Sequence, residues 1–172
     1  EILLQWWENN RRDFPWRKRR EEDPWRILAT AVLLWKTNAT SVGKVYDIFF
    51  SEFSTPKHLI FSPSARVLEI LKPTGLYNRK YHILVKIAKA LEDGNLYDLL
   101  DQLGQYISNV GKIMLFKEKI IPIDSPAKRL ISRVFNYNIA NIRDLDSNDK
   151  KFLERIVKNE DPSKIYWAIV AF

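Results

Sequence analysis

The sequence predicts an all-α fold, and three observations support this prediction. Strand signals are weak, because apolar and polar residues rarely alternate between turn residues. Apolar residues recur instead at intervals of three and four, as they do on one face of a helix. At five places a proline follows a residue suited to helix capping, where proline loses nothing by lacking an N–H group. The five pairs are Asp23-Pro24, Thr55-Pro56, Ser62-Pro63, Ser125-Pro126 and Asp161-Pro162.

The expected helices follow one another along the chain by their apolar spacing. Besides the proline pairs, Thr40, Asn78 and Ser147 precede such runs, and one run ends near Gly94. About nine or ten short helices joined by brief loops are expected. In chain order the apolar sets are Ile27, Leu28, Ala31, Leu34 and Trp35; Val45, Ile48, Phe49 and Phe53; Ile83, Leu84, Ile87, Ala88 and Leu91; Leu130, Ile131, Val134 and Phe135; Phe152, Ile156 and Val157; and Trp167, Val170 and Ala171.

The composition is that of a globular protein with a basic surface. The 172 residues suit one compact domain or two small lobes that share a core, and 46% of them are hydrophobic. The net charge of +7 favours a polyanionic partner, nucleic acid before anionic membrane, although simple solubility also accounts for it. Six Trp, seven Tyr and nine Phe supply core packing and possible stacking surface for bases.

Several classes of site and location are excluded or disfavoured. The chain has no Cys, which excludes disulfides, thiol catalysis and thiolate metal sites, and its two His leave little basis for a catalytic zinc. We expect no metal site. No apolar run is long enough to span a membrane, and no signal-peptide pattern opens the sequence. The expected location is intracellular, either cytoplasmic and nucleoid-associated or nuclear.

One carboxylate stands out for its position. The apolar stretch 121–123 ends in Asp124, and a helix is predicted to begin at once. The partial positive charge of that helix end should keep Asp124 ionised. An aspartate near a helix start is usually a cap, but Ser125 can fill that role here. Lys128 and Arg129 lie one turn further on, where they could meet phosphate.

The stretch 100–109, LDQLGQYISN, is typical of a helix end, a tight hairpin at Gly104 and a second helix that continues through Phe116. It resembles the helix-hairpin-helix (HhH-GPD) DNA glycosylases, the superfamily of endonuclease III and the adenine-mismatch glycosylases, and above all the thymine-DNA (T/G mismatch) branch. The resemblance covers nearly the whole chain. Its other segments are Trp6-Trp7-Glu8, Arg12 to Arg17, Trp25 to Leu34, and Gly75 to Lys80, the loop that fills the gap left by a flipped base.

The resemblance implies a two-lobed helical fold. Residues 21–124 would form a six-helix lobe with the helix-hairpin-helix near 96–116, and residues 1–20 with 125–172 a second lobe made from both termini. Asp124 falls on the catalytic aspartate of the family. Tyr106 falls where lyase members carry a Lys whose amine attacks the sugar. A phenol forms no such adduct, so the resemblance implies a monofunctional enzyme; the alternative is that Tyr106 only packs its helix.

The resemblance also implies a set of DNA contacts. Leu76 or Tyr77 would fill the hole left by the extruded nucleotide, and Lys36 would reach the strand from the other side. For Leu76 a core-packing role is an equal alternative. Hairpin backbone N–H groups would hold phosphate. The predicted DNA-binding residues are Lys36, Leu76, Tyr77, Asn78, Arg79, Leu103, Gly104, Gln105, Lys128 and Arg129.

A rival hairpin register and three departures from the family pattern remain open. The rival register places Gly111 in the hairpin and Ile113 at the reaction-type position. We prefer the first register, with Gly104 in the hairpin, because it aligns Asp124 with the aspartate of the family without a deletion. In the hairpin, Gln102 replaces the first glycine and Asp101 the proline, and a carboxylate facing phosphate would weaken binding. Ala31 replaces the Glu of adenine-mismatch and thymine–guanine members, which argues against adenine excision.

The third departure concerns iron, because many relatives hold a four-iron cluster on four Cys beyond the last helix. With no Cys in these residues, we expect no cofactor in this chain, which is either a cluster-free member or a shortened one. The expected partner is double-stranded DNA with a mismatched or damaged base, bound by a monomer. The leading hypothesis is excision of thymine or uracil opposite guanine. The alternatives are a glycosylase for damaged pyrimidines, a DNA-binding relative with weakened catalysis, and a helical protein-interaction domain.

Overall fold

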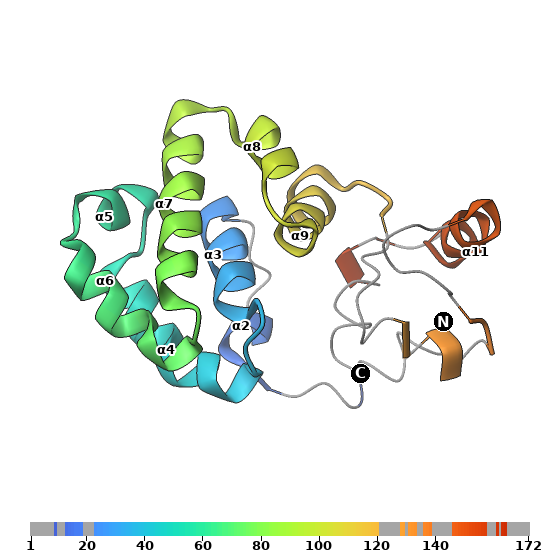
Figure 1. The fold of residues 1–172 in the computed structure, drawn as a ribbon, viewed down its shortest axis with the longest axis horizontal. Helices are drawn as coiled ribbons and strands as arrows, with labels where there is room; N and C mark the ends of the chain where they lie inside the picture. Colours follow the sequence, from blue (N-terminus) through green and yellow to red (C-terminus); the bar gives the residue numbers. More distant parts are fainter. Residues whose placement is uncertain are drawn as a thin grey trace. The chain divides into compact units, whose positions relative to one another are not determined.

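The computed structural model consists of helices and their connections in the residues it describes, which are 13–18, 23–120 and 146–157 with residue 9 and the short pieces 128–129, 131–133, 136–138, 161 and 163–164 (Figure 1). No strand occurs among them, and the predicted all-α class is confirmed. Contacts divide the chain into two units, residues 13–111 and residues 1–12 with 112–172. Each unit is described by itself.

The helices are short and closely spaced, as expected. In chain order they are α2 (Pro15–Lys18), α3 (Pro24–Leu34), α4 (Ala39–Glu52), α5 (Pro56–Phe61), α6 (Ser64–Leu71), the 3-10 helix η1 (Lys72–Thr74), α7 (Tyr77–Asp93), α8 (Leu96–Gln102), α9 (Gln105–Phe116) and α11 (Ser147–Val157).

The proline pairs that the structure describes lie at helix starts, but one of them does not cap its helix as predicted. Asp23 accepts a hydrogen bond from the N–H of Trp25 (3.0 Å), and Thr55 accepts one from the N–H of His58 (3.3 Å), so both cap as predicted. A helix also begins at the third pair, one residue late, but the predicted capping by Ser62 is wrong. Its hydroxyl donates backwards to the carbonyl of His58 (2.6 Å), closing α5, and α6 begins one residue late after Pro63 without a side-chain cap.

Two other predicted starts shift by a residue or two. Asn38, not Thr40, caps α4, and its side-chain oxygen accepts from the N–H of Ser41 (2.8 Å). Helix α7 begins at Tyr77, so Asn78 already lies inside it. The end of α7 agrees with the prediction, because Gly94 adopts a left-handed conformation (φ 72°) that favours glycine.

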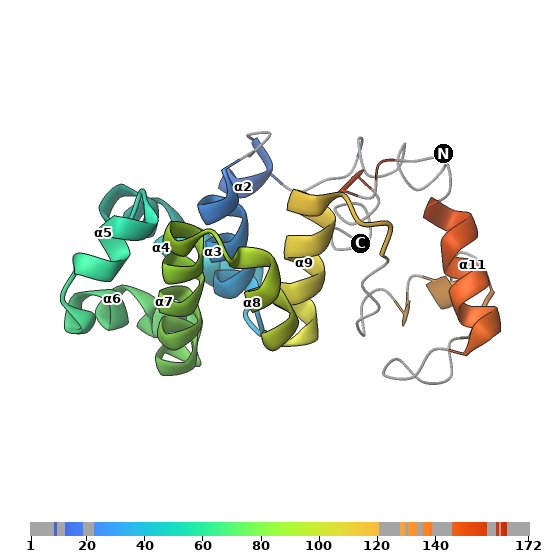
Figure 2. The same cartoon turned by 90° about the horizontal axis from the view of Figure 1, so that it is seen from above.

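Helix α7 lies at the centre of the 13–111 unit. Figures 1 and 2 show α7 between α3 on one side and α5 with α6 on the other, and all three contact it, as does α8. Its side chains Leu84 and Ile87 are completely buried. The residues that follow α3 and precede α7 are therefore brought together at one end of this layer.

An aromatic cluster fills the interior beside α4. Trp25 packs against Phe49, and its indole N–H donates to the carbonyl of Phe53 (2.8 Å). Trp16 of α2 is buried and contacts Tyr46 of α4 (ring centroids 5.4 Å apart). Much of the aromatic content thus serves packing. The contact also assigns residues 13–18 to the 13–111 unit, whereas the predicted lobe boundary lay between residues 20 and 21.

The other unit is described in part. In α11, Asp146 rather than Ser147 caps the helix, accepting from the N–H groups of Asn148 (2.7 Å) and Asp149 (2.8 Å). The Asp161 carboxylate accepts from the N–H of Ser163 (2.9 Å), which fits the predicted start there. The pair at 125–126 lies outside the described residues. None of the described helices combines the length and apolar character that a membrane crossing needs.

Candidate nucleic-acid interface

Two stretches of chain form what we call the Trp35 corner, namely residues 35–37 after α3 and residues 72–80 from η1 into α7. Three of these residues have left-handed backbones, namely Lys36 (φ 51°), Gly75 (φ 65°) and Leu76 (φ 47°). A left-handed conformation costs a lysine or leucine roughly 1 kcal/mol or more and persists only where the surroundings hold it. The corner is therefore a strained part of the fold with a defined shape.

Two cations meet on one indole at this corner. The Lys36 ammonium lies 5.7 Å from the Trp35 ring centroid, and the Arg79 guanidinium lies 5.5 Å from it. Both distances are within the range of cation–π attraction. Lys36 and Arg79 are both exposed and come from different segments of the chain. The structure thus brings together two of the residues predicted to bind DNA.

The other predicted residues of the corner line its surface. Leu76 is 47% exposed, which is high for a leucine and argues against the core-packing alternative. Asn78 is exposed, and Tyr77 is half-buried. An exposed apolar side chain beside two cations suits insertion into a base stack. Their role in DNA binding stays a prediction.

A buried lysine lies beneath the corner. Lys80 is completely buried, and its Nζ donates to the carbonyls of Leu33 (2.8 Å) and Thr74 (3.0 Å) and to the hydroxyl of Thr37 (2.6 Å). Burial lowers the pKa of Lys80 to about 8, so the ammonium is still charged at neutral pH. The Thr37 hydroxyl lies 2.6 Å from the Thr74 carbonyl, so it can donate there and close the network.

The sequence places Lys80 in the segment from Gly75 to Lys80 but predicts no function for it. One signal in the sequence could have revealed it. Lys80, Leu84 and Ile87 are spaced as neighbours on one helix face, and the other two are completely buried. A lysine on the apolar face of a helix needs buried acceptors. Trp35 was likewise counted only among the apolar residues of its helix.

The predicted hairpin is present in the first of the two registers. Helix α8 ends at Gln102, and α9 begins at Gln105, so that Leu103 and Gly104 form the turn. The carbonyl of Gly104 accepts from the N–H groups of Ile107 (3.0 Å) and Ser108 (3.1 Å), which starts α9. Gly104 and Gln105 are exposed and Leu103 is half-buried.

The rival register is wrong, because Gly111 lies inside α9 and serves close packing. A Cβ atom at this position would lie 2.6 Å from Cδ2 of Leu100 and 3.2 Å from Cδ2 of Leu28. Leu100 and Leu28 are completely buried, so a side chain at residue 111 would force them out of their present packing between α8, α9 and α3.

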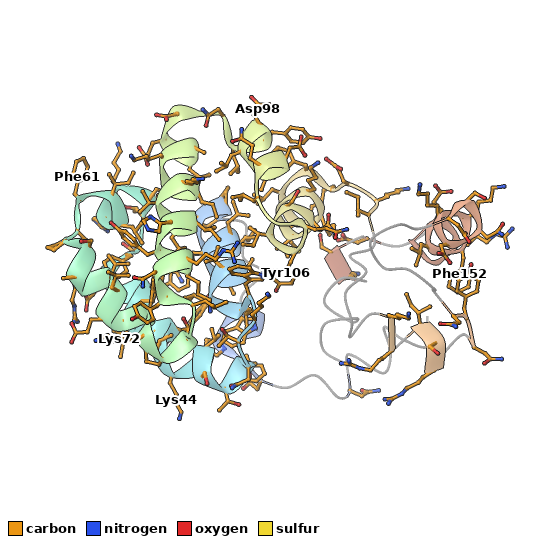
Figure 3. All side chains as sticks on the ribbon, in the orientation of Figure 1. Lys44, Phe61, Lys72, Asp98, Tyr106 and Phe152 are labelled. Carbon is orange, nitrogen blue, oxygen red and sulfur yellow. The ribbon has the colours of Figure 1, made fainter. Side chains whose placement is uncertain are left out.

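Of the two predicted catalytic residues, the structure describes Tyr106 but not Asp124. Tyr106 is the second residue of α9 and is half-buried (Figure 3). Asp124 lies outside the described residues, as does the whole of 121–127. Lys128 is half-buried and Arg129 is exposed, both in the other unit. The catalytic pairing of Tyr106 and Asp124 therefore stays a prediction.

The residues of this chain do not suit an iron–sulfur cluster. Such clusters are held mainly by Cys thiolates, and the 172 residues contain no Cys. Within the described ranges, no three His, Asp or Glu side chains gather in a way that could hold a metal ion.

Comparison with known proteins relates the chain to DNA repair enzymes. The sequence profile of the HhH-GPD superfamily of base excision DNA repair proteins matches residues 29–157. A thymine/uracil-DNA glycosylase of Methanothermobacter thermautotrophicus is 30% identical over 149 residues, which cover 81% of this chain and 66% of that protein. An endonuclease III of Thermotoga maritima is 26% identical over 130 residues, covering 70% and 61% respectively. The chain thus spans less than two thirds of the length of these relatives.

A solved structure has a similar fold. The structure of a thermostable thymine-DNA glycosylase matches with a TM-score of 0.76 and 26% sequence identity, covering 98% of this chain and 81% of that one.

Proposed function

The chain belongs to the HhH-GPD superfamily of base excision DNA repair proteins, and we propose that it is a monofunctional DNA glycosylase for thymine or uracil opposite guanine. The observation that carries the proposal is the 30% identity with a thymine/uracil-DNA glycosylase over most of this chain. Tyr106, which the resemblance places at the reaction-type position of the family, lies in the hairpin helix α9 and supports the proposed absence of lyase activity. We propose that the protein acts as a monomer on double-stranded DNA.

The proposed reaction is hydrolysis of the N-glycosidic bond. As the bond from C1′ to the base breaks, the sugar gains oxocarbenium character, and a nearby carboxylate stabilises that charge. Asp124 is proposed to do this and to accept a proton from the attacking water. The water oxygen bonds to C1′, and the base leaves with the electron pair of the broken bond. With Tyr106 in place of a lysine, no enzyme amine competes with the water.

The Trp35 corner and the hairpin are proposed to hold the DNA. A nucleotide inside the stack is out of reach, and its extrusion costs a few kcal/mol, less for a mispaired base. Leu76, half exposed in a left-handed turn, would occupy the vacated space. Lys36 and Arg79 would meet phosphates beside it. The hairpin N–H groups around Gly104 would grip the backbone on the other side of the lesion.

A panel of lesion duplexes tests the proposed activity. Uracil and thymine opposite guanine should yield alkali-labile abasic sites, whereas matched duplexes should stay intact. Uncut mismatches would refute the proposal. Asp124→Asn should abolish turnover and spare DNA binding, because the amide keeps the shape and loses the charge. Full activity of that variant would remove Asp124 from its role.

The reaction type has a separate test. Borohydride reduces a Schiff base to a permanent protein–DNA adduct, and the wild-type protein should give none. Tyr106→Lys should introduce some adduct if residue 106 faces the sugar. An adduct with the wild-type protein would show a lyase and contradict the monofunctional assignment.

Two alternatives rest on specific observations. Ala31 is buried on α3, where thymine–guanine members of the family carry a Glu, and the identity with an endonuclease III fits a glycosylase for damaged pyrimidines. The same lesion panel, extended to oxidised pyrimidines, separates the two. The exposed Asp101 and Gln102 beside the hairpin favour instead a DNA-binding relative with weakened catalysis. That alternative predicts DNA affinity without cleavage of any duplex.

A further inference from the structure

We propose that Lys80 is a positioning residue, whose buried ammonium ties together the two stretches of the Trp35 corner and thereby sets the spacing of Lys36, Leu76 and Arg79 for DNA. The proposal rests on the proposed function for its DNA partner. The tie itself is a property of the fold, and it can be measured without DNA.

The geometry of the tie joins segments that are distant in sequence. Lys80 lies 47 residues from Leu33 and 43 from Thr37, yet its Nζ bonds to both as well as to Thr74. The ammonium has three donors, and each has an acceptor within 3.0 Å. One side chain therefore connects the end of α3, the loop after it and the end of η1.

A cation suits this place for an electrostatic reason. Leu33 lies in the last turn of α3, and Thr74 is the last residue of η1. Carbonyl groups at helix C-terminal ends lack partners within the helix and carry partial negative charge. Two such ends meet here inside the protein. An ammonium group between them donates to both, whereas an apolar side chain would leave the Leu33 carbonyl without this donor and the Thr74 carbonyl with the Thr37 hydroxyl alone.

The tie also explains how two strained residues are held. Lys36 precedes Thr37, and Leu76 follows Thr74 by two residues, so each left-handed backbone lies next to a bonded group. The Thr37 hydroxyl at 2.6 Å from the Thr74 carbonyl adds a direct link between the two stretches. Such conformations persist when their neighbours over-determine them. Without the tie, the exposed loops would relax toward ordinary backbone angles.

The consequence for DNA binding follows from Trp35. Lys36 reaches its ring from the loop after α3, and Arg79 reaches it from the first turn of α7. The separation of these two cations depends on how the two stretches are joined. Lys80 is buried and touches no phosphate itself, so any effect of its removal on DNA affinity must pass through the exposed residues.

The first experiment compares Lys80→Met with Lys89→Met, an exposed lysine on the same helix, by amide hydrogen exchange. In Lys80→Met, exchange of the Thr37 and Gly75 amides, bonded to the carbonyls of Leu34 and Lys72, should accelerate at least about tenfold. The Phe53 amide, bonded to Phe49, should keep its rate. Lys89→Met should change none of the three. Equal exchange in both variants would overturn the tie.

The second experiment asks whether the tie sets the DNA-binding geometry. Affinity for a mismatched duplex is measured against salt concentration for Lys80→Met, Arg79→Ala and the double variant. The quantity compared is the slope of log affinity against log salt concentration. Lys80 is buried, so if this slope is smaller by about 1 in Lys80→Met, exposed phosphate contacts have been displaced. The double variant should lose less affinity than the product of the single losses. An unchanged slope with multiplicative losses would refute the positioning role.

A third variant keeps the proposal testable if Lys80→Met fails to fold. Thr37→Val removes the bridging hydroxyl and keeps Lys80. It should accelerate exchange of the Gly75 amide by a smaller factor than Lys80→Met does, and it should also reduce the salt dependence of DNA affinity. No change in either measurement would count against the tie. Should the wild-type protein bind DNA in this manner but cut no duplex, the proposed catalytic function fails while the positioning role stands. A wild-type protein with no DNA affinity overturns the role in DNA binding.

Discussion

The Trp35 corner and the hairpin are both predicted to meet DNA, but different forces hold them in place. The corner depends on a buried ammonium and three hydrogen bonds, whereas the hairpin depends on apolar contact between α8, α9 and α3 around Gly111. Polar bonds fix two strained loops at defined distances. Close packing fixes two helix axes and leaves the turn between them exposed. The corner therefore presents side chains, and the hairpin presents its backbone.

The largest expected effect comes from the packing that supports the hairpin. Gly111→Val should reduce the free energy of unfolding by about 3 kcal/mol, because the added atoms would overlap Leu100 and Leu28. Thermal or urea unfolding measures the loss. Gly43→Val is the matched control, since a Cβ at Gly43 meets nothing within 4 Å and should leave stability within about 0.5 kcal/mol. Equal stability of both variants would mean that α9 is less closely packed than described.

A pH titration tests the polar side of the comparison. Burial lowers the pKa of Lys80 in the folded protein to about 8, from an ordinary value of 10.5. Between these values the unfolded chain binds more protons than the folded one, so this group makes stability rise as pH increases from about 8 to 10.5. Relative to Lys80→Met, the wild-type protein should gain about 2–3 kcal/mol across that window, since one pKa unit corresponds to about 1.4 kcal/mol.

Urea unfolding at several pH values measures this difference. Lys89→Met serves as the control, because an exposed lysine should show the same pH dependence as the wild-type protein. If the difference between the wild-type protein and Lys80→Met is flat from pH 7 to 10.5, then Lys80 is more hydrated than its burial indicates.

The turn of the hairpin offers a smaller effect, on binding alone. Gly104 meets nothing within 4 Å at its Cβ position and has no left-handed backbone, so Gly104→Ala should leave stability nearly unchanged. A methyl group there would still keep a phosphate from the backbone N–H groups. We expect DNA affinity to fall about fivefold, roughly 1 kcal/mol, in a filter-binding or anisotropy assay. Unchanged affinity would indicate that the hairpin does not contact the backbone of DNA.

The smallest expected effect concerns the acidic neighbour of the hairpin. Asp101 is exposed at the end of α8, where it would repel phosphate. Asp101→Asn should tighten DNA binding about twofold to threefold at low salt, and the gain should shrink as salt increases. The control is Asp93→Asn, because Asp93 is exposed at the end of α7, one helix before the hairpin. An equal gain from both variants would point to net charge rather than to the hairpin.

The sequence predicted those parts of the fold that local chemistry decides. Capping by Asp23 and Thr55, the glycine end of α7 and the hairpin at Gly104 all follow from short-range rules. Ser62 was predicted wrongly because a serine between two helices has two options. Its hydroxyl can accept from an N–H group of the next helix or donate to a carbonyl of the preceding one, and here it donates to His58. Helix α7 starts at Tyr77 because a left-handed Leu76 precedes it, which no local preference of leucine indicates.

The candidate site also has one part that the sequence predicts and one part that it does not. The exposed residues of the corner were identified through resemblance, but the group that organises them was not. The spacing of Lys80 with Leu84 and Ile87 indicates that the lysine is buried, but not that it bonds to two main-chain carbonyls and to a threonine 43 residues away. Predicting such a contact requires the packing of α3 against α7. The role of Gly111 likewise depends on how closely α9 approaches its neighbours, and a helical pattern alone leaves the glycine unexplained.

The acceptors of Lys80 determine which substitutions around it the fold can tolerate. Two of the three acceptors are peptide carbonyls, which every amino acid provides. Mutations at positions 35, 36 and 76–79 can therefore replace the side chains that are predicted to face DNA without removing the main-chain partners of the lysine. Under the proposed function, base preference could change at this corner by single substitutions, because none of them removes the main-chain partners of Lys80.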